Sequence, residues 1–175
     1  MVIAGRILRL LALSLWVGAI VFFGAVVART AVQVFGTTQL FADFIGQTLL
    51  QLHSLGLWCG VALLVSLRLI GVRAYRLNVQ ASLALIMIVL TFVSNRAIIL
   101  PMEHDRALAG GDIKVLMPGS PLREDFDARH AWSTRVEGAV LLCGIGLIVM
   151  IGLEAGEERR LNTSPSKVFD LSSDV

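Results

Sequence analysis

Three histidines provide the side chains best suited to bind a metal or move protons in this chain of 175 residues. Imidazole nitrogens suit copper, iron and zinc, and the thioethers of Met102 and Met117 would suit cuprous copper. Haem is also held between the helices of four-helix bundles. We therefore take His53 and His130 as candidate cofactor ligands, and His104 with Met102 as candidate metal ligands.

The spacing of these residues does not match a known ligand motif. The sequence contains no His-x-x-x-His pair, no Cys-x-x-Cys pair and no haem-attachment sequence. We therefore expect no bound cofactor, and keep haem or copper as the alternative.

A second interpretation treats the polar residues near the histidines as a pathway for a substrate or for protons. Ionisable groups inside a membrane are costly, so a cluster of them indicates function by default. In this interpretation Glu137 and His130 are the titrating pair, and Arg96 or Arg135 supplies the counter-charge.

A third interpretation of the same residues is structural. Long arginine side chains can extend to the membrane interface, and Arg96 and Arg135 can also pair with Glu137 and Asp127. Gln47 and Gln51 would then hydrogen-bond between helices, as glutamines do in membranes. All three interpretations require membrane helices, and the composition of the chain tests that requirement.

Hydrophobic residues make up 56% of the chain and charged residues only 16%, and the mean hydropathy is +0.79. Soluble domains carry about 25% charged residues, and a domain of about 150 residues buries only ~70% of its unfolded surface. A soluble fold is excluded on these grounds, as is a disulfide scaffold, because there are only two cysteines. The chain is predicted to be an integral membrane protein.

Four stretches are long and apolar enough to cross a bilayer, at about residues 7–30, 44–70, 77–100 and 128–154. The first contains nineteen uncharged residues, which measure about 28 Å as a helix and so approach the ~30 Å hydrocarbon core. A retained helix is preferred over a signal peptide, whose apolar region runs only about 7–15 residues. Pro101 is expected to end or kink the third span.

The fourth helix is expected to begin before its span, because Ser120-Pro121 is a helix-start signal. Its first turns then project from the bilayer. Residues 101–120 form the one substantial extramembrane loop, and short turns at 35–43 and 71–76 make neighbouring helices antiparallel. Residues 1–156 are thus predicted to form an all-α four-helix transmembrane bundle, and residues 157–175 a polar, flexible tail.

The positive-inside rule orients this bundle in a cell (cytoplasmic or inner) membrane. Both termini and the turn at 71–76 share one side with eight basic residues: Arg6, Arg9, Arg68, Arg73, Arg76, Arg159, Arg160 and Lys167. Seven lie on the other side, but basic residues close to the first helix and in short loops weigh more. Both termini are therefore predicted to be cytoplasmic, which places the histidines and the polar cluster on the opposite side. That cluster comprises Gln47, Gln51, Arg96, Arg135 and Glu137.

Helix periodicity separates two faces of the second span. His53 lies on one face with Gly56 and Gly60, whose small-xxx-small spacing allows close helix packing. Gln47 and Gln51 lie on a different face of the same helix. The glycine face is expected to pack against another helix.

Several local patterns resemble the transmembrane protein 205-like family (domain of unknown function 4149) over roughly residues 7–153. They are Leu13-Ser14-Leu15-Trp16-Val17-Gly18 with Phe22, Phe23 and Val26-Val27-Ala28; then Arg96, Ile98, Pro101, Met102 and Arg106; then Phe126, His130, Ser133 and Glu137. Arg29 departs from the pattern, since a proline is expected there. The resemblance implies the fold and the membrane location but no reaction, and a looser similarity to copper-resistance membrane proteins leaves the metal interpretation open.

The sequence contains no nucleophile with an adjacent base, no Walker loop and no carboxylate pair placed for hydrolysis, so we expect no enzyme. The expected role is that of a small scaffold or accessory subunit of a membrane complex. It would contact the lipid bilayer, pair through its glycine faces with itself or with other membrane subunits, and bind no nucleic acid. The alternative is a transporter or a metal- or haem-binding protein that uses the non-cytoplasmic polar cluster.

Overall fold

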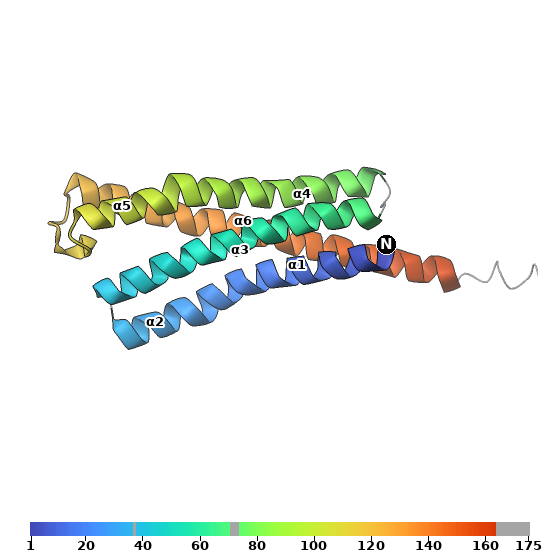
Figure 1. Ribbon diagram of the computed structural model, residues 1–175, viewed down its shortest axis with the longest axis horizontal. Coiled ribbons are helices and arrows are strands. Elements are labelled where there is room, and N and C mark those ends of the chain that lie inside the picture. The colour runs from blue at the N-terminus through green and yellow to red at the C-terminus, as the bar shows by residue number, and fades with distance from the viewer. Residues whose placement is uncertain (37, 71–73, 164–175) are drawn as a thin grey trace, which may run out of the picture.

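The computed structural model describes residues 1–36, 38–70 and 74–163, in which four helical rods lie side by side along one long axis (Figure 1). The elements are, in order, α1 (Val2–Phe22), the π-helical η1 (Phe23–Val27), α2 (Ala28–Phe35), α3 (Gln39–Ile70), α4 (Ala74–Val93), the π-helical η2 (Ser94–Ile99), α5 (Leu100–Leu108), the short 3-10 helix η3 (Ile113–Val115) and α6 (Pro121–Thr163). The fold is the predicted all-α four-helix bundle.

The four rods are long and apolar enough to cross a membrane, at Val2–Phe35, Gln39–Ile70, Asn78–Leu108 and Pro121–Glu157. The N-terminus and the far end of α6 lie toward one end of the bundle, called here the terminal end. The connections from α2 to α3 and from α5 to α6 lie at the other, the loop end (Figure 1). Neighbouring rods are thus antiparallel.

The first rod extends beyond its predicted span because Arg29 does not interrupt it. Arginine is a good helix former whose long side chain can reach the membrane interface. The rod ends instead at Gly36, whose φ of +62° lies in the left-handed region that favours glycine. Its amide donates to the carbonyl of Val32 over 2.9 Å and closes the last turn.

The predicted loop at 101–120 is helical over its first part, because the third rod continues through Pro101 to Leu108. A proline ring clashes with the carbonyl four residues earlier in a regular α-helix. The wider π-helical turn of η2 ends at Ile99, two residues before Pro101, and the amide of Leu100 bonds to the carbonyl of Asn95, which relieves this clash. After Leu108 the chain turns at Gly110 and Gly111, which both have positive φ.

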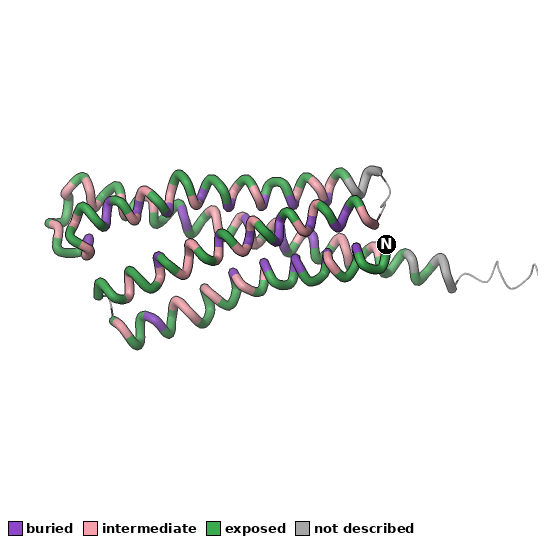
Figure 2. Tube along the Cα trace, viewed as in Figure 1, coloured by how far each residue is buried: buried purple, intermediate pink, exposed green. Residues whose placement is uncertain are grey.

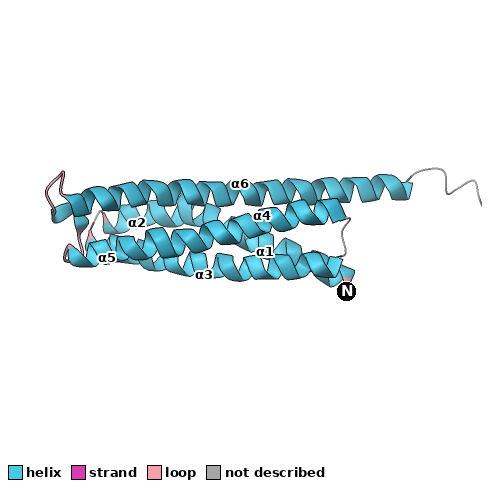
Figure 3. Cartoon of the chain, turned by 90° about the horizontal axis from the view of Figure 1, so that it is seen from above, coloured by secondary structure: helices cyan, strands magenta, loops and turns pink. Residues whose placement is uncertain are grey.

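Helix α6 begins at Pro121, as the Ser120-Pro121 signal predicted, and its 43 residues measure about 64 Å. It therefore extends well past a ~30 Å hydrocarbon core, and Figure 3 shows it overhanging α4 at the terminal end. Part of the predicted tail is helical, because α6 continues to Thr163 through residues such as Glu157 and Arg160 that favour helix. The rest of that tail, from residue 164, lies outside the described residues, as do residues 71–73 of the predicted turn.

The apolar core lies between the rods, midway along the bundle, and buried residues recur turn by turn on the inner faces (Figure 2). Trp16 of α1 is 1% exposed, and Met87 of α4 and Val140 of α6 are fully buried. Gly56 and Gly60 of α3 are buried against this core. A Cβ at Gly56 would lie 2.5 Å from Nε1 of Trp16, and one at Gly60 would meet Ile88 of α4. The glycine face of α3 therefore packs inside the bundle, against α1 and α4.

The substitution Gly56→Ala is expected to destabilise the bundle by about 1–3 kcal/mol, because its methyl group would overlap the indole of Trp16. Thermal unfolding in detergent, followed by circular dichroism, measures the loss. Gly138→Ala in α6 is the matched control. No heavy atom lies within 4 Å of a Cβ at Gly138, so removing this helical glycine should stabilise the protein by about 0.5–1 kcal/mol. Equal melting shifts for the two variants would contradict this packing.

Candidate functional site

A cavity of about 320 Å³ opens at the loop end between α3, α5, η3 and α6. In the view of Figure 1, the α1–α3 pair diverges from α5 toward this end of the bundle. Apolar side chains form most of the cavity wall, among them Ile45, Leu49, Ile99, Met102 and Phe126. Charged side chains complete the lining: Glu103, Arg106, Asp112, Lys114, Arg123 and Asp127, with His130 and Ser133 on α6.

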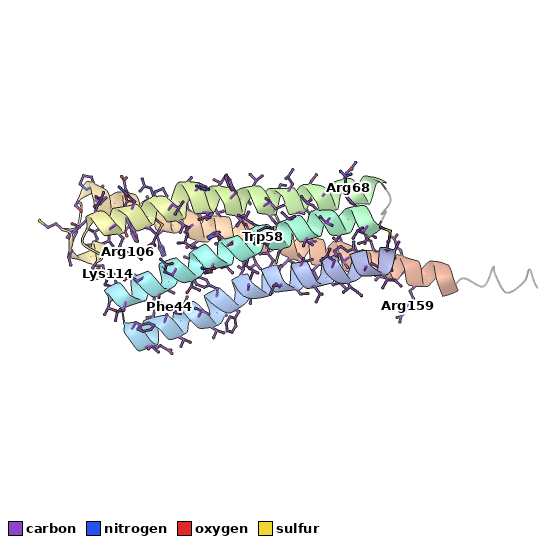
Figure 4. The ribbon with its side chains drawn as sticks, in the orientation of Figure 1. Phe44, Trp58, Arg68, Arg106, Lys114 and Arg159 are labelled. Carbon is purple, nitrogen blue, oxygen red and sulfur yellow. The ribbon has the colours of Figure 1, made fainter. Side chains whose placement is uncertain are left out.

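Arg106 fixes one wall of this cavity. Its buried guanidinium donates to the carbonyl of Ala42 over 2.6 Å and pairs with Glu103 and, at 3.5 Å, with Asp43. These contacts join α5 to the first turns of α3. Gly46 permits the close approach, because a Cβ there would collide with the carboxylate of Glu103. Arg106 and Lys114 both lie at the loop end in Figure 4.

A second group of contacts holds the connection between α5 and α6. Asp105, which is buried, pairs with Arg129 of α6. Arg123 donates to the carbonyl of Leu116 over 3.0 Å, and Ile113 of η3 is buried. The connection is thus an ordered part of the cavity wall.

The buried His53 and the partly buried Glu137 form a pair one turn inward of the cavity lining. Nε2 of His53 lies 2.6 Å from Oε1 of Glu137, and Nδ1 lies 2.8 Å from the carbonyl oxygen of Leu49. A carbonyl can only accept, so Nδ1 carries a proton. Nε2 then faces the carboxylate of Glu137, so this contact joins α3 to α6.

The pathway interpretation paired Glu137 with His130, but the structure pairs Glu137 with His53. His130 shares a helix face with Glu137, but seven residues separate them by about 10 Å along the axis, too far for contact. His130 is exposed and lines the cavity one turn before the buried Ser133. Of the predicted cofactor ligands, His53 already has both ring nitrogens hydrogen-bonded.

The remaining predicted site residues are dispersed. Met102 is buried in the cavity wall, and His104 is exposed. Arg96 and Arg135 are exposed and lie over aromatic rings of their own helices, 5.8 Å from the centroid of Phe92 and 5.1 Å from that of Trp132. Neither supplies a counter-charge to Glu137. Among the described residues, no three His, Cys, Asp or Glu side chains are grouped as metal ligands.

Gln47 and Gln51 are exposed on the outer face of α3, and no other helix of the described chain hydrogen-bonds to their amides. They do not hydrogen-bond between helices within the chain, as the structural interpretation expected. The cause is helix phase, since the opposite face of α3 holds His53, Gly56 and Gly60 against the core.

A polar cluster at the terminal end was not predicted from the sequence. Nη1 of the buried Arg9 lies 2.9 Å from both Oε1 of Gln80 and Oε2 of Glu154, and the amide of Gln80 donates to Glu154. These contacts join α1, α4 and α6 with no net charge. The sequence does contain a signal for this cluster. An arginine, a glutamine and a glutamate each lie at the terminal-end border of a different apolar span.

These features define a multi-pass membrane protein with a four-helix bundle, two polar clusters between its helices and a cavity at the loop end. The chain belongs to the family Domain of unknown function (DUF4149), whose model matches residues 11–106. That match confirms the resemblance to domain of unknown function 4149, while the link to transmembrane protein 205 stays a prediction. In comparisons with curated proteins and with solved structures, no match was found.

The substitution Glu137→Leu leaves Nε2 of a buried imidazole without a partner, so the free energy of unfolding should fall by about 1–3 kcal/mol. The double variant His53→Leu/Glu137→Leu should recover most of this loss, because replacing both partners by apolar groups is nearly neutral. A thermodynamic cycle over the two single variants and the double variant measures the coupling. The exposed Thr134→Val serves as control, and strictly additive effects would refute the pairing.

Proposed function

We propose that the protein is a small structural subunit of the membrane, without catalytic activity or a bound cofactor of its own. In this proposal it assembles through an exposed polar face of α3. The observation that carries the proposal is the composition of this face, which comprises Asp43, Gln47, Gln51, Ser54 and Trp58. All five residues are exposed, and Trp58 is 73% exposed.

The five residues share one face because their spacing is i, i+4, i+8, i+11 and i+15. Gln47, Gln51 and Trp58 lie about 12, 18 and 28 Å from the first residue of α3. All three fall within a ~30 Å hydrocarbon core centred on this helix. Figure 4 labels Trp58 in the middle part of the bundle, on α3.

A glutamine amide or an indole N–H that faces lipid loses its hydrogen bonds to water without replacement, which is unfavourable. A polar side chain on a neighbouring transmembrane helix restores them, with a gain of about 0.6–2 kcal/mol for each hydrogen bond. Tryptophan is also enriched among residues that dominate the binding energy of protein interfaces. The polar face of α3 is therefore better satisfied against protein than against lipid.

The glycine face expected to pair with another subunit is already occupied, because Gly56 and Gly60 contact Trp16 and Ile88 inside the bundle. The polar face lies on the opposite side of α3. Its proposed partner is the same face of a second copy. Side-chain amides both donate and accept, and two copies inserted in one orientation bring Gln47 and Gln51 to equal depth around a two-fold axis.

The double substitution Gln47→Leu/Gln51→Leu should weaken self-association roughly tenfold, since it removes at least two hydrogen bonds across the interface. Single-molecule photobleaching in liposomes at several protein-to-lipid ratios measures the dimer fraction. Gln33→Leu is the matched control, because Gln33 is an exposed glutamine of α2 outside the polar face.

Unchanged dimerisation in the double variant would overturn pairing through this face. A monomer at every ratio for the unaltered protein would overturn pairing with a second copy. In that case, a membrane subunit that co-purifies with the unaltered protein but not with the double variant would show that the polar face of α3 binds a different partner.

We also propose a cytoplasmic-membrane location with both termini in the cytoplasm. The support is the weight of basic residues near the first helix and in the short turn at the terminal end. A reporter enzyme that works only in the cytoplasm should be active when it is fused after Val175. A second reporter, active only outside the cytoplasm, should be inactive at the same position, and the reverse pattern would invert the topology.

A further inference from the structure

We propose that the loop-end cavity binds a phospholipid-type amphiphile, in which acyl chains carry a phosphate headgroup. The cavity is formed by the side of α3 opposite its polar face, together with α5, η3 and α6. The inference therefore stands apart from the proposed pairing through α3, and either can fail without the other.

The inner part of the cavity has the chemistry of an acyl-chain site. Helix α3 runs inward from Phe41 to Leu49 along the cavity, α6 runs inward from Arg123 to Ser133, and the third rod runs outward from Ile99 to Arg106. The innermost lining is accordingly Leu49, Ile99 and Ser133, followed by Ile45 and Met102. The volume of about 320 Å³ lies at the lower end of the range for pockets that hold small organic ligands, about 300–1,000 Å³.

The outer part of the cavity carries two basic side chains that form no ion pair with the described residues. Within the described residues, neither Lys114 nor Arg123 takes part in an ion pair, and Arg123 uses one of its N–H groups to hold the carbonyl of Leu116. Arg106 differs from both because Glu103 and Asp43 neutralise it. Two free cations at one rim suit a phosphate, which accepts charge-assisted hydrogen bonds from arginine and lysine.

Asp127 lies on the same rim, one helical turn after Arg123. Its carboxylate is placed to accept the ammonium group of a zwitterionic headgroup whose phosphate contacts Lys114 and Arg123. The cavity lining contains three acidic residues, Glu103, Asp112 and Asp127, and three basic residues, Arg106, Lys114 and Arg123, a mixture that suits a headgroup with both charges. The best-matched ligand is thus a phospholipid of the phosphoethanolamine type.

The apolar and charged parts of the cavity are arranged in the same order as the chains and headgroup of a lipid in the loop-side leaflet. Its apolar lining points toward the middle of the bundle, and its charged rim lies at the end of the bundle. A lipid could therefore occupy the cavity with its chains toward the bilayer centre and its headgroup at the membrane surface.

Native mass spectrometry of the purified protein in detergent, titrated with dioctanoyl phosphatidylethanolamine, tests the proposal. Lys114→Ala/Arg123→Ala should raise the Kd roughly tenfold through loss of two charge-assisted contacts. Ile45→Trp should lower binding by a similar factor by filling the apolar part. Arg96→Ala/Arg135→Ala is the matched control, since both arginines lie over aromatic rings outside the cavity. Melting curves verify that each variant is folded.

Two further probes distinguish the parts of the ligand. Dioctanoylglycerol lacks the phosphate, and inorganic phosphate lacks the chains, so both should bind at least tenfold more weakly than the phospholipid. Equal binding of dioctanoylglycerol would overturn the headgroup assignment, and equal binding of inorganic phosphate would overturn the chain assignment. Equal phospholipid binding by the folded cavity variants and the control variant would overturn the site itself.

Discussion

A bilayer interior offers no hydrogen bonds, so a polar side chain at membrane depth is costly unless a neighbouring group bonds to it. Two clusters inside the chain meet this constraint. His53 hydrogen-bonds to Glu137 between α3 and α6, and Arg9 contacts Gln80 and Glu154 across α1, α4 and α6. Each cluster is a contact between rods that have no hydrophobic drive to associate in lipid. Helix α6 takes part in both, which explains how the longest helix holds the bundle together near each end.

The middle of the bundle depends on close packing in place of polar contacts. Gly56 and Gly60 leave room for Trp16 and Ile88, so α3 approaches α1 and α4 between the two polar clusters. The inner side of α3 therefore has two parts. From His53 to the terminal end it packs tightly in the core. Between the loop end and His53 it lines the cavity, because Arg106 and Gly46 hold α5 close to α3 only at the cavity rim.

The four rods were predictable because each contains an apolar run of membrane length, and the inner face of α3 because His53, Gly56 and Gly60 recur at helical spacing. The contacts between rods were not. Whether Glu137 contacts His53 or His130 depends on the depth and rotation of two helices distant in sequence, which periodicity within one helix does not encode. The helix through Pro101 was missed for a related reason, since a π-helical turn before a proline has no simple pattern in the sequence.

The same constraint makes the outer face of α3 informative. Arg96 and Arg135 are exposed, yet each lies over an aromatic ring and is long enough to reach the interface. Gln47 and Gln51 lie over no aromatic ring that the structure describes, and their side chains are shorter than that of arginine. Trp58 lies farther from the loop end than either glutamine. No described residue of the chain hydrogen-bonds to these three side chains at membrane depth, whereas His53 and Nη1 of Arg9 both have partners inside the bundle. The proposed pairing through α3 would supply hydrogen-bond partners to this face, and lipid would not.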